Sequence, residues 1–258
     1  MQTAIGYLSV VPLRADAAHR SEQVSQILFG DTVTVLEWGA EWSHVRCNWD
    51  GYEGWCRSSQ LQVLEAAEQL SPVQYLVAGK MQYMMHEQGS FPVSIGSSLP
   101  GWNDHELNWG SKTFRYYEPL HDLQQVQVTD AALEGIARSF IDVPYLWGGR
   151  SVFGIDCSGM SQLVFKMLGI SIRRDAWQQA EEGVKVPYAE EARCGDLAFF
   201  HNAKGRINHV GILFNANTII HATDTAGRVV VDRFDSQGII SNRTGERTHQ
   251  LTTIQRYF

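Results

Sequence analysis

The sequence contains few cysteines and none of the spacings with which cysteine and histidine usually bind zinc. Four cysteines in 258 residues are too few for a disulfide framework. No C-x-x-C pair and no H-E-x-x-H segment occurs in the sequence, so neither a structural nor a catalytic zinc site is indicated. Cys47 and Cys56 fall in predicted strands, where we expect two small buried residues. We therefore expect no metal and no cofactor.

The sequence also lacks an excess of positive charge, a long apolar run and a recognisable signal peptide. The net charge of −7 argues against non-specific nucleic-acid binding, which needs a basic surface. The apolar runs are far shorter than a membrane span. The first residues show no basic segment followed by an apolar one. We expect a cytoplasmic protein without nucleic-acid or membrane partners, and the sequence does not indicate its oligomeric state.

The chain contains three successive regions that differ in residue composition and in predicted secondary structure. Residues 1–65 contain short β-branched runs, such as 31–36 and 43–47, and the hairpin signal Asp50-Gly51. Residues 66–128 are rich in aromatic residues and turns and also favour strands. In residues 129–258 helical patterns come first and strand patterns second, which predicts an α+β domain.

The third region is predicted to begin with three helices. Asp130 is a suitable N-cap for a first helix that ends before Pro144. A second helix follows Cys157 and is closed by Gly169, and a third covers about residues 176–182. The period then changes to two, and four antiparallel strands are predicted at residues 196–200, 209–214, 218–223 and 228–232.

Cys157 is predicted to be a nucleophile. It stands between an acid and a serine, directly before an amphipathic helical pattern. A cysteine at a helix N-terminus faces unpaired backbone N–H groups and the positive end of the helix dipole. We expect these groups to stabilise a thiolate and the Cys157 backbone N–H to serve as an oxyanion donor.

Two histidines on neighbouring predicted strands supply a base and its partner. A cysteine nucleophile needs a base, and the base needs a third group on its other ring nitrogen. Alternation along the strands predicts that His209 and His221 share one face, so we assign His209 as the base and His221 as the orienting group. Gly211 is expected to leave room for substrate beside His209. The remaining histidines are expected to have no catalytic role: His19, His44, His86, His105, His121, His201 and His249.

Residues 129–235 resemble the NlpC/P60 family of papain-like cysteine peptidases. The resemblance rests on six ordered blocks, at residues 144–149, 156–159, 174–179, 195–200, 209–212 and 220–222. It implies a papain-like fold of helices plus an antiparallel sheet, with Cys157, His209 and His221 as the family's catalytic triad. Tyr145 falls on a tyrosine that lies near the nucleophile in this family.

Residues 1–65 resemble a bacterial SH3 domain, SH3b. The matching residues include Val11-Pro12-Leu13-Arg14, Trp42 and the segment 50–55. Residues 66–128 are interpreted as a second, divergent SH3b-like region with its linker. The fold is thus expected to be an NlpC/P60 domain preceded by one or two small SH3b-type β-barrels.

The resemblance to family members with N-terminal SH3b domains implies a substrate for this chain. Those members are γ-D-glutamyl-L-diamino acid endopeptidases, which act on murein peptides with a free N-terminal L-alanine. The resemblance implies that Asp156 binds the substrate ammonium, that Ser158 hydrogen-bonds beside it, and that Tyr52 and Glu22 wall off the site. The segment 173–176 departs from the family pattern, which often has a proline before Arg174 and a serine after Asp175.

Two alternatives remain open at this stage. The chain would be a non-catalytic cell-wall binding protein if its peptidase region were only a scaffold. It would be a papain-like amidase or acyltransferase if its substrate were not murein. The sequence does not distinguish lysine from diaminopimelate at the third position of the peptide, nor whether the SH3b regions cap the site or bind the wall.

Overall fold

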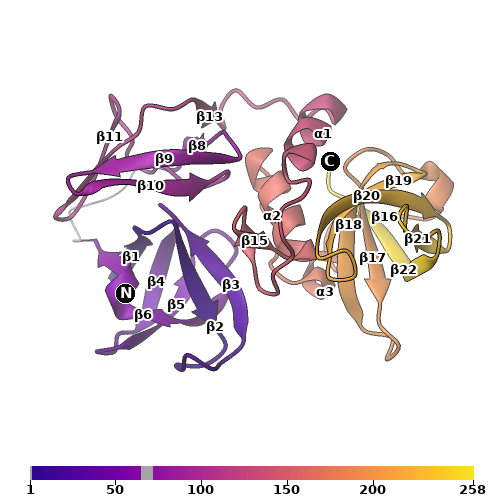
Figure 1. The fold of residues 1–258 in the computed structure, drawn as a ribbon, viewed down its shortest axis with the longest axis horizontal. Coiled ribbons are helices and arrows are strands. Elements are labelled where there is room, and N and C mark those ends of the chain that lie inside the picture. Colours follow the sequence, from indigo (N-terminus) through magenta and orange to yellow (C-terminus); the bar gives the residue numbers. More distant parts are fainter. Residues whose placement is uncertain (1, 65–71) are drawn as a thin grey trace. The chain divides into compact units, whose positions relative to one another are not determined.

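The computed structural model describes residues 2–64 and 72–258, which form two compact units. Unit 1 comprises Met1–Val126 together with Trp147–Phe153, and unit 2 comprises Gln127–Leu146 and Gly154–Phe258 (Figure 1). The sequence-based boundary at residues 65 and 66 lies outside the described residues. Within the described part of the chain, no helix is long and apolar enough to cross a membrane.

Seven strands of unit 1 form an antiparallel sheet that curls into a small barrel (Figure 1). Their order across the sheet is β3-β2-β6-β5-β4-β1-β7. The strands at residues 31–36 and 43–47 are confirmed as β4 and β5, and Gly51, with φ +73°, lies in the turn between β5 and β6. The bounds are β1 (Gln2–Gly6), β2 (Val10–Arg14), β3 (Gln23–Leu28), β4 (Thr32–Glu37), β5 (Trp42–Cys47), β6 (Glu53–Arg57) and β7 (Leu61–Val63), with a 3₁₀ turn at Ser58–Gln60.

The remainder of unit 1 carries a four-stranded sheet, β10-β9-β12-β11, and the pair β13-β8. These strands share a hydrophobic core with the barrel, in which the rings of Phe29 and Trp109 lie 4.8 Å apart. The bounds are β8 (Tyr75–Val77), β9 (Met81–His86), β10 (Gly89–Ser94), β11 (Glu106–Trp109), β12 (Lys112–Arg115) and β13 (Leu120–Asp122).

The segment 147–153 returns to unit 1 from a later part of the sequence. It contains β14 (Arg150–Ser151), which packs beside β3. Arg150 is buried, its backbone N–H donates to Gln26 Oε1 at 2.7 Å, and its guanidinium lies 3.4 Å from Asp31 Oδ2. A buried ion pair and a backbone hydrogen bond therefore attach this segment to the barrel.

Unit 2 begins with the predicted helices, with two corrections. Thr129, not Asp130, is the N-cap of α1 (Asp130–Ser139), because its hydroxyl accepts from the Ala132 N–H. The third helix is shorter than predicted, since α3 (Ala176–Gln179) ends at Ala180. The helix α2 (Cys157–Met167) follows the short strand β15 (Gly154–Ile155), and Gly169, with φ +75°, closes it as predicted.

The sheet of unit 2 has the order β16-β22-β17-β18-β19-β20-β21, and an additional β21–β22 pairing closes it into a ring. The four predicted strands are confirmed as β17 (Leu197–His201), β18 (Ile207–Asn215), β19 (Thr218–Thr223) and β20 (Arg228–Asp235). Three strands escaped prediction because they are short or largely polar: β16 (Val184–Val186), β21 (Gly238–Ile240) and β22 (Arg247–Arg256). A 3₁₀ turn covers Ala189–Glu191.

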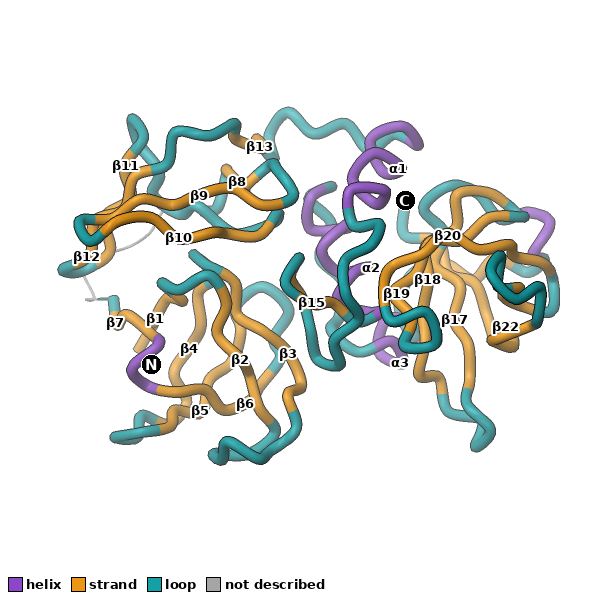
Figure 2. The backbone as a smooth tube through the Cα atoms, viewed as in Figure 1, coloured by secondary structure: helices purple, strands orange, loops and turns teal. Residues whose placement is uncertain are grey.

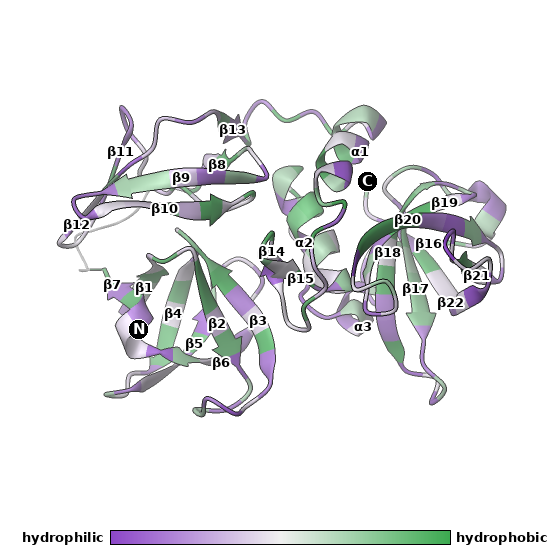
Figure 3. Ribbon diagram, viewed as in Figure 1, coloured by the Kyte–Doolittle hydropathy of each residue, from purple (hydrophilic) through white to green (hydrophobic). Residues whose placement is uncertain are grey.

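Burial of α2 places its N-terminus at the sheet. Every residue of α2 is buried, and the helix packs against β18 and β19. All three helices lie on one side of the sheet (Figure 2), and α2 is hydrophobic over much of its length (Figure 3). Removing this apolar surface from water stabilises the contact by about 25 cal/mol per Å². The first residue of α2, Cys157, is consequently held beside the strands that carry the histidines.

Candidate active site

Cys157 occupies the first turn of α2. Asp156 is the N-cap, and its Oδ1 accepts from the Gly159 N–H at 2.7 Å. Cys157 Sγ lies 4.0 Å from the carbonyl oxygen of Asn208, and the N–H of Val210 also interacts with the sulfur. The sulfur therefore faces the backbone on both sides of His209. As the first helical residue, Cys157 has a backbone N–H without an acceptor inside the helix.

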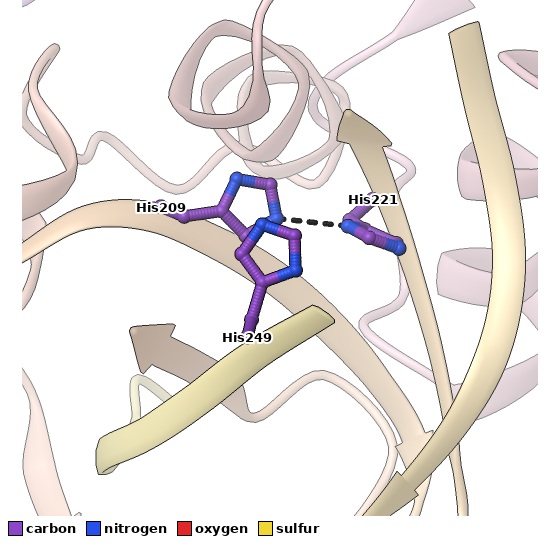
Figure 4. A group of neighbouring side chains, drawn as sticks. All are labelled: His209, His221 and His249. Carbon is purple, nitrogen blue, oxygen red and sulfur yellow. Dashed lines mark hydrogen bonds between the residues drawn. The ribbon is translucent and has the colours of Figure 1, made fainter. Parts of the chain in front are cut away.

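The two predicted histidines are brought together by strands β18 and β19. His209 Nε2 and His221 Nδ1 lie 2.8 Å apart, and their rings are inclined by 80° (Figure 4). Both side chains are buried. The remaining ring nitrogen of His209, Nδ1, points away from His221 in Figure 4.

Asp232 extends the His209–His221 pair to a row of three side chains and determines which nitrogen of each imidazole carries the proton. Its Oδ2 lies 3.2 Å from His221 Nε2. Burial raises the pKa of Asp232, but hydrogen bonds from His221 and from the Asn242 backbone N–H lower it below its usual value, so the carboxylate is ionised and can only accept. His221 must then donate from Nε2 and, when neutral, accept at Nδ1. His209 consequently donates from Nε2 and keeps the lone pair on Nδ1.

Burial controls the charge state of the nucleophile and the base. It raises the pKa of Cys157 to about 12, with the Asp156 carboxylate adding to the effect. Burial, together with His249 and His221, holds the pKa of His209 well below its ordinary value. The Ser158 N–H in the first turn of α2 lowers the pKa of Cys157, in the direction expected for a helix N-terminus, but burial and the Asp156 carboxylate outweigh it.

Gly211 serves the packing of the histidine pair. A Cβ at this position would lie 2.6 Å from Ile219 Cδ1 and 3.1 Å from His221 Cβ. The space that we expected to admit substrate is thus filled by side chains of β19. Glycine is required here so that His221 can approach β18 closely.

A third imidazole, His249, joins the two predicted ones. It extends from β22 and stacks on His209, with ring centroids 4.1 Å apart and planes inclined by 23° (Figure 4). Burial is also the main cause that lowers the pKa of His249, to about 4. Sequence reasoning assigned no role to His249, because β22 itself was not predicted.

The three imidazoles also form a cluster of potential metal ligands. Their ligand atoms all lie within 4.8 Å of one another. A metal ion bonds imidazole nitrogen in the ring plane, at about 2.0–2.1 Å. The stacked rings of His209 and His249, inclined by only 23°, do not converge on a common in-plane ligand position, and the 2.8 Å contact between His209 and His221 is the length of a hydrogen bond. The arrangement suits a proton-transfer row better than a metal centre.

Tyr145 lies close enough to the nucleophile to sense its charge. Its backbone N–H donates to the Gly227 carbonyl at 2.9 Å, and it forms a parallel bridge with Ile155. Burial raises the pKa of Tyr145, and the charges of Cys157 and Asp156 raise it further. The phenol is therefore a neutral hydrogen-bond donor at pH 7.

Asp156 and Ser158 belong to a buried polar cluster with Arg174. Arg174 donates from Nη2 to Asp156 Oδ2 at 2.7 Å, and from Nη1 to Asp156 Oδ1 at 3.1 Å. It also donates to Ser158 Oγ at 2.9 Å, and the Ser158 hydroxyl donates to Asp156 Oδ1 at 3.3 Å. Oδ1 accepts three of these bonds when the Gly159 N–H is included, whereas Oδ2 accepts the Arg174 bond. These hydrogen bonds hold the Asp156 carboxylate in a fixed orientation.

Glu22 and Tyr52 lie in unit 1 and are described within it. Glu22 Oε1 accepts a hydrogen bond from Trp147 Nε1 at 2.6 Å, and the Trp147 side chain is otherwise exposed. Tyr52 is half-buried and packs against the barrel core. Their predicted roles in substrate recognition stay predictions.

Sequence reasoning missed three residues that contact the predicted ones. Asp232 ends an apolar strand pattern, Arg174 was noted only as part of a family block, and His249 lies on the unpredicted strand β22. A signal existed only for Arg174, which stands in the family block at residues 174–179. Asp232 and His249 reach their partners only because the sheet closes, and local sequence patterns do not predict that closure.

Two family models match parts of the chain. Residues 142–248 match the NlpC/P60 family, and residues 13–61 match the bacterial dipeptidyl-peptidase Sh3 domain. The second model confirms one SH3b-type domain and does not extend to the region 66–128.

Similar proteins extend the match over most of the chain. The gamma-D-glutamyl-L-lysine dipeptidyl-peptidase of Bacillus subtilis (strain 168) is 30% identical over 222 residues, which cover 80% of this chain and 74% of that protein. The dipeptidyl-peptidase 6 of Lysinibacillus sphaericus is 25% identical, covering 91% and 92%. An NlpC/P60 family protein from Bacillus cereus ATCC 10987 has a solved structure with a TM-score of 0.79 and 22% identity, covering 99% of both chains, and supports the fold.

Proposed function

The chain belongs to the NlpC/P60 family, and on this basis we propose that it hydrolyses the γ-D-glutamyl-L-diamino acid bond of murein peptides with a free N-terminal L-alanine. It is a cysteine peptidase that acts on cell-wall peptides. The observation that carries the proposal is the row from Asp232 through His221 to His209, beside the sulfur of Cys157.

The proposed reaction uses this row as a proton shuttle. Cys157 Sγ attacks the γ-glutamyl carbonyl carbon while His209 Nδ1 takes the thiol proton. The oxyanion is stabilised by the Cys157 backbone N–H at the start of α2, with Tyr145 as a further donor. The C–N bond then breaks, and the His209 imidazolium protonates the departing amine. Water, deprotonated by His209, hydrolyses the thioester and releases the thiol.

A second group, the carboxylate of Asp156, supports the choice of peptides with a free amino terminus. An ammonium needs a charged acceptor, and the Asp156 carboxylate, next to the nucleophile in the sequence, is such a group. The buried position of Asp156 strengthens such a contact, because little water competes with it. Ser158 would hold the carboxylate in place through its own hydrogen bond.

The proposal is tested with L-Ala-γ-D-Glu-L-Lys, its meso-diaminopimelate counterpart and the N-acetylated form of each. We expect release of L-Ala-γ-D-Glu from the free peptides and at least about a 100-fold lower kcat/KM for the acetylated ones, since an ammonium–carboxylate contact is lost. Cys157→Ala should abolish turnover. Cys194→Ala removes a thiol that does not contact the proposed catalytic residues, and it should leave peptide turnover unchanged.

Other outcomes of the same assay would favour the alternatives. Retention on intact sacculi without hydrolysis of any soluble peptide would indicate a binding protein. Equal cleavage of free and acetylated peptides would remove the role of Asp156, and turnover of other amides or esters alone would indicate an amidase or acyltransferase. The cytoplasmic location stays a prediction, which cell fractionation would check.

A further inference from the structure

We propose that His249 is a positioning residue that holds the His209 ring in one plane and shields it from water. The inference rests on the proposed peptidase function, because it assigns a partner to the base of that reaction. His249 itself is not expected to touch the substrate or the reacting atoms.

The stacking geometry carries the argument. His249 covers one face of His209 at a centroid distance of 4.1 Å, while His221 meets the edge of the same ring at 5.0 Å and 80° (Figure 4). A hydrogen bond at Nε2 alone leaves the ring able to rotate about the line of that bond. A parallel ring against its face removes this freedom, so the direction of the Nδ1 lone pair is fixed.

The closed sheet brings His249 to this position. On β17, Phe200 pairs with His209 of β18 on one side and with Leu251 of β22 on the other. His249 precedes Leu251 by two residues and so extends from the same face of the sheet. The rings of Phe200 and His249 lie 5.7 Å apart, which places an apolar wall behind the stacked pair.

His249 does not continue the proton row. Its Nδ1 lies 2.9 Å from the hydroxyl of the neighbouring Thr248, and no hydrogen bond joins it to His209 in the part of the chain that the structure describes. Contact through the ring face gives shielding and orientation but no route for a proton. A stacked neutral ring therefore fits the geometry better than an additional acid or base.

Shielding has an electrostatic consequence for His209. The groups that face it are His221 from β19 and His249 from β22, with the uncharged Phe200 on β17. The sulfur of Cys157 from α2 contacts the backbone of Asn208 and Val210, on either side of His209. Asp232 on β20 lies beyond His221, and Asp224 acts on His249. Since burial is the largest cause of the low pKa of His209, exposing its face should raise that pKa.

Three substitutions of His249 separate shielding from orientation. His249→Phe keeps a flat ring, His249→Leu keeps apolar bulk without a ring, and His249→Ala removes both. The ring protons of His209 are titrated by NMR in each protein, with the signal assigned by its loss in His209→Ala. Peptide turnover is measured as kcat and KM across the same pH range, and thermal unfolding shows that each variant is folded.

His249→Ala should raise the titration midpoint of His209 by about one unit or more towards the ordinary histidine value. Its kcat should fall about tenfold with KM nearly unchanged, because a misdirected base acts on the chemical step. His249→Phe should keep both properties near wild type. In His249→Leu the titration midpoint of His209 should stay low, but kcat should fall. His201→Ala, on the adjacent β17, is the matched control and should change neither.

An unchanged His209 midpoint and an unchanged kcat in His249→Ala would overturn the proposal, as would equal damage in His249→Phe and His249→Ala. If His249→Ala does not fold, the comparison of the Phe and Leu variants decides. The NMR titration needs no substrate. Wild-type protein that fails to cleave murein peptides would therefore refute the proposed function, while the His209 midpoints would still test the role of His249.

Discussion

His221 Nε2 donates a hydrogen bond to Asp232 Oδ2 at 3.2 Å, and this contact sets the direction of the next one. Because the carboxylate can only accept, the neutral His221 must accept from His209 Nε2. The lone pair of His209 is thereby placed on Nδ1, the nitrogen that points away from His221. Asp232 thus acts on the proposed base through another residue and not by contact with substrate.

Asp232→Asn should lower kcat about 100-fold or more while KM changes little. The amide nitrogen can donate to His221 Nε2, which reverses both hydrogen bonds and puts the proton on the wrong nitrogen of His209. Asp235→Asn is the matched control, since Asp235 lies on the same strand and pairs with Arg247 at the surface. A loss of activity smaller than about threefold in Asp232→Asn would contradict the tautomer argument, and a similar loss in Asp235→Asn would point to a defect of the strand.

The resting thiol should be alkylated slowly at neutral pH. Burial and Asp156 raise the pKa of Cys157 to about 12, so deprotonation of the free protein increases with pH up to that value. The rate of Cys157 modification by iodoacetamide, followed by mass spectrometry, should rise about tenfold per pH unit between pH 6 and 9. A plateau below pH 7 would instead show a thiolate–imidazolium pair and would refute the neutral resting state.

Gly211→Ala should reduce activity by at least about tenfold, because a Cβ would meet Ile219 and His221 at 2.6 Å and 3.1 Å. We expect β19 to shift away from β18 to relieve this clash, and the shift should lengthen the hydrogen bond between His209 and His221. Gly135→Ala is the control, since nothing lies within 4 Å of a Cβ added at that helical position. Wild-type turnover in Gly211→Ala would show that the histidine pair tolerates the shift.

Local patterns in the sequence predicted the parts of the site that depend on local structure. Cys157 precedes an apolar helical period, and His209 and His221 lie on strands with alternating character joined by a short turn. Position at the start of a helix and the face of a strand both follow from neighbours in sequence. The contact between the two histidines could therefore be anticipated, and the structure places them 2.8 Å apart.

Residues that depend on closure of the sheet could not be predicted in the same way. His249 reaches His209 only because β22 pairs with β17 and β21, and β22 consists mainly of polar residues without a clear period. The start of the helix at Cys157 was visible in the sequence, but the burial of the sulfur, which raises the pKa of the thiol, was not. Long-range pairing and desolvation are properties of the folded chain.

Arg174→Met should destabilise the protein by about 3–5 kcal/mol, because it leaves the buried carboxylate of Asp156 without its cation. In a domain of this size such a loss lowers the unfolding midpoint by roughly 10 °C. Methionine preserves most of the side-chain volume, so a cavity contributes little to the effect.

The neighbouring Arg173→Met provides the control for Arg174→Met. Arg173 is 58% exposed and pairs with Glu182 at 3.2 Å, a type of surface ion pair that contributes little. Calorimetry of both variants should therefore show a large shift for Arg174 and almost none for Arg173. Equal midpoints in all three proteins would mean that groups other than Arg174 compensate the charge of Asp156. In that case Asp156 would also be a poor partner for an ammonium, and the preference for free amino termini would need another cause.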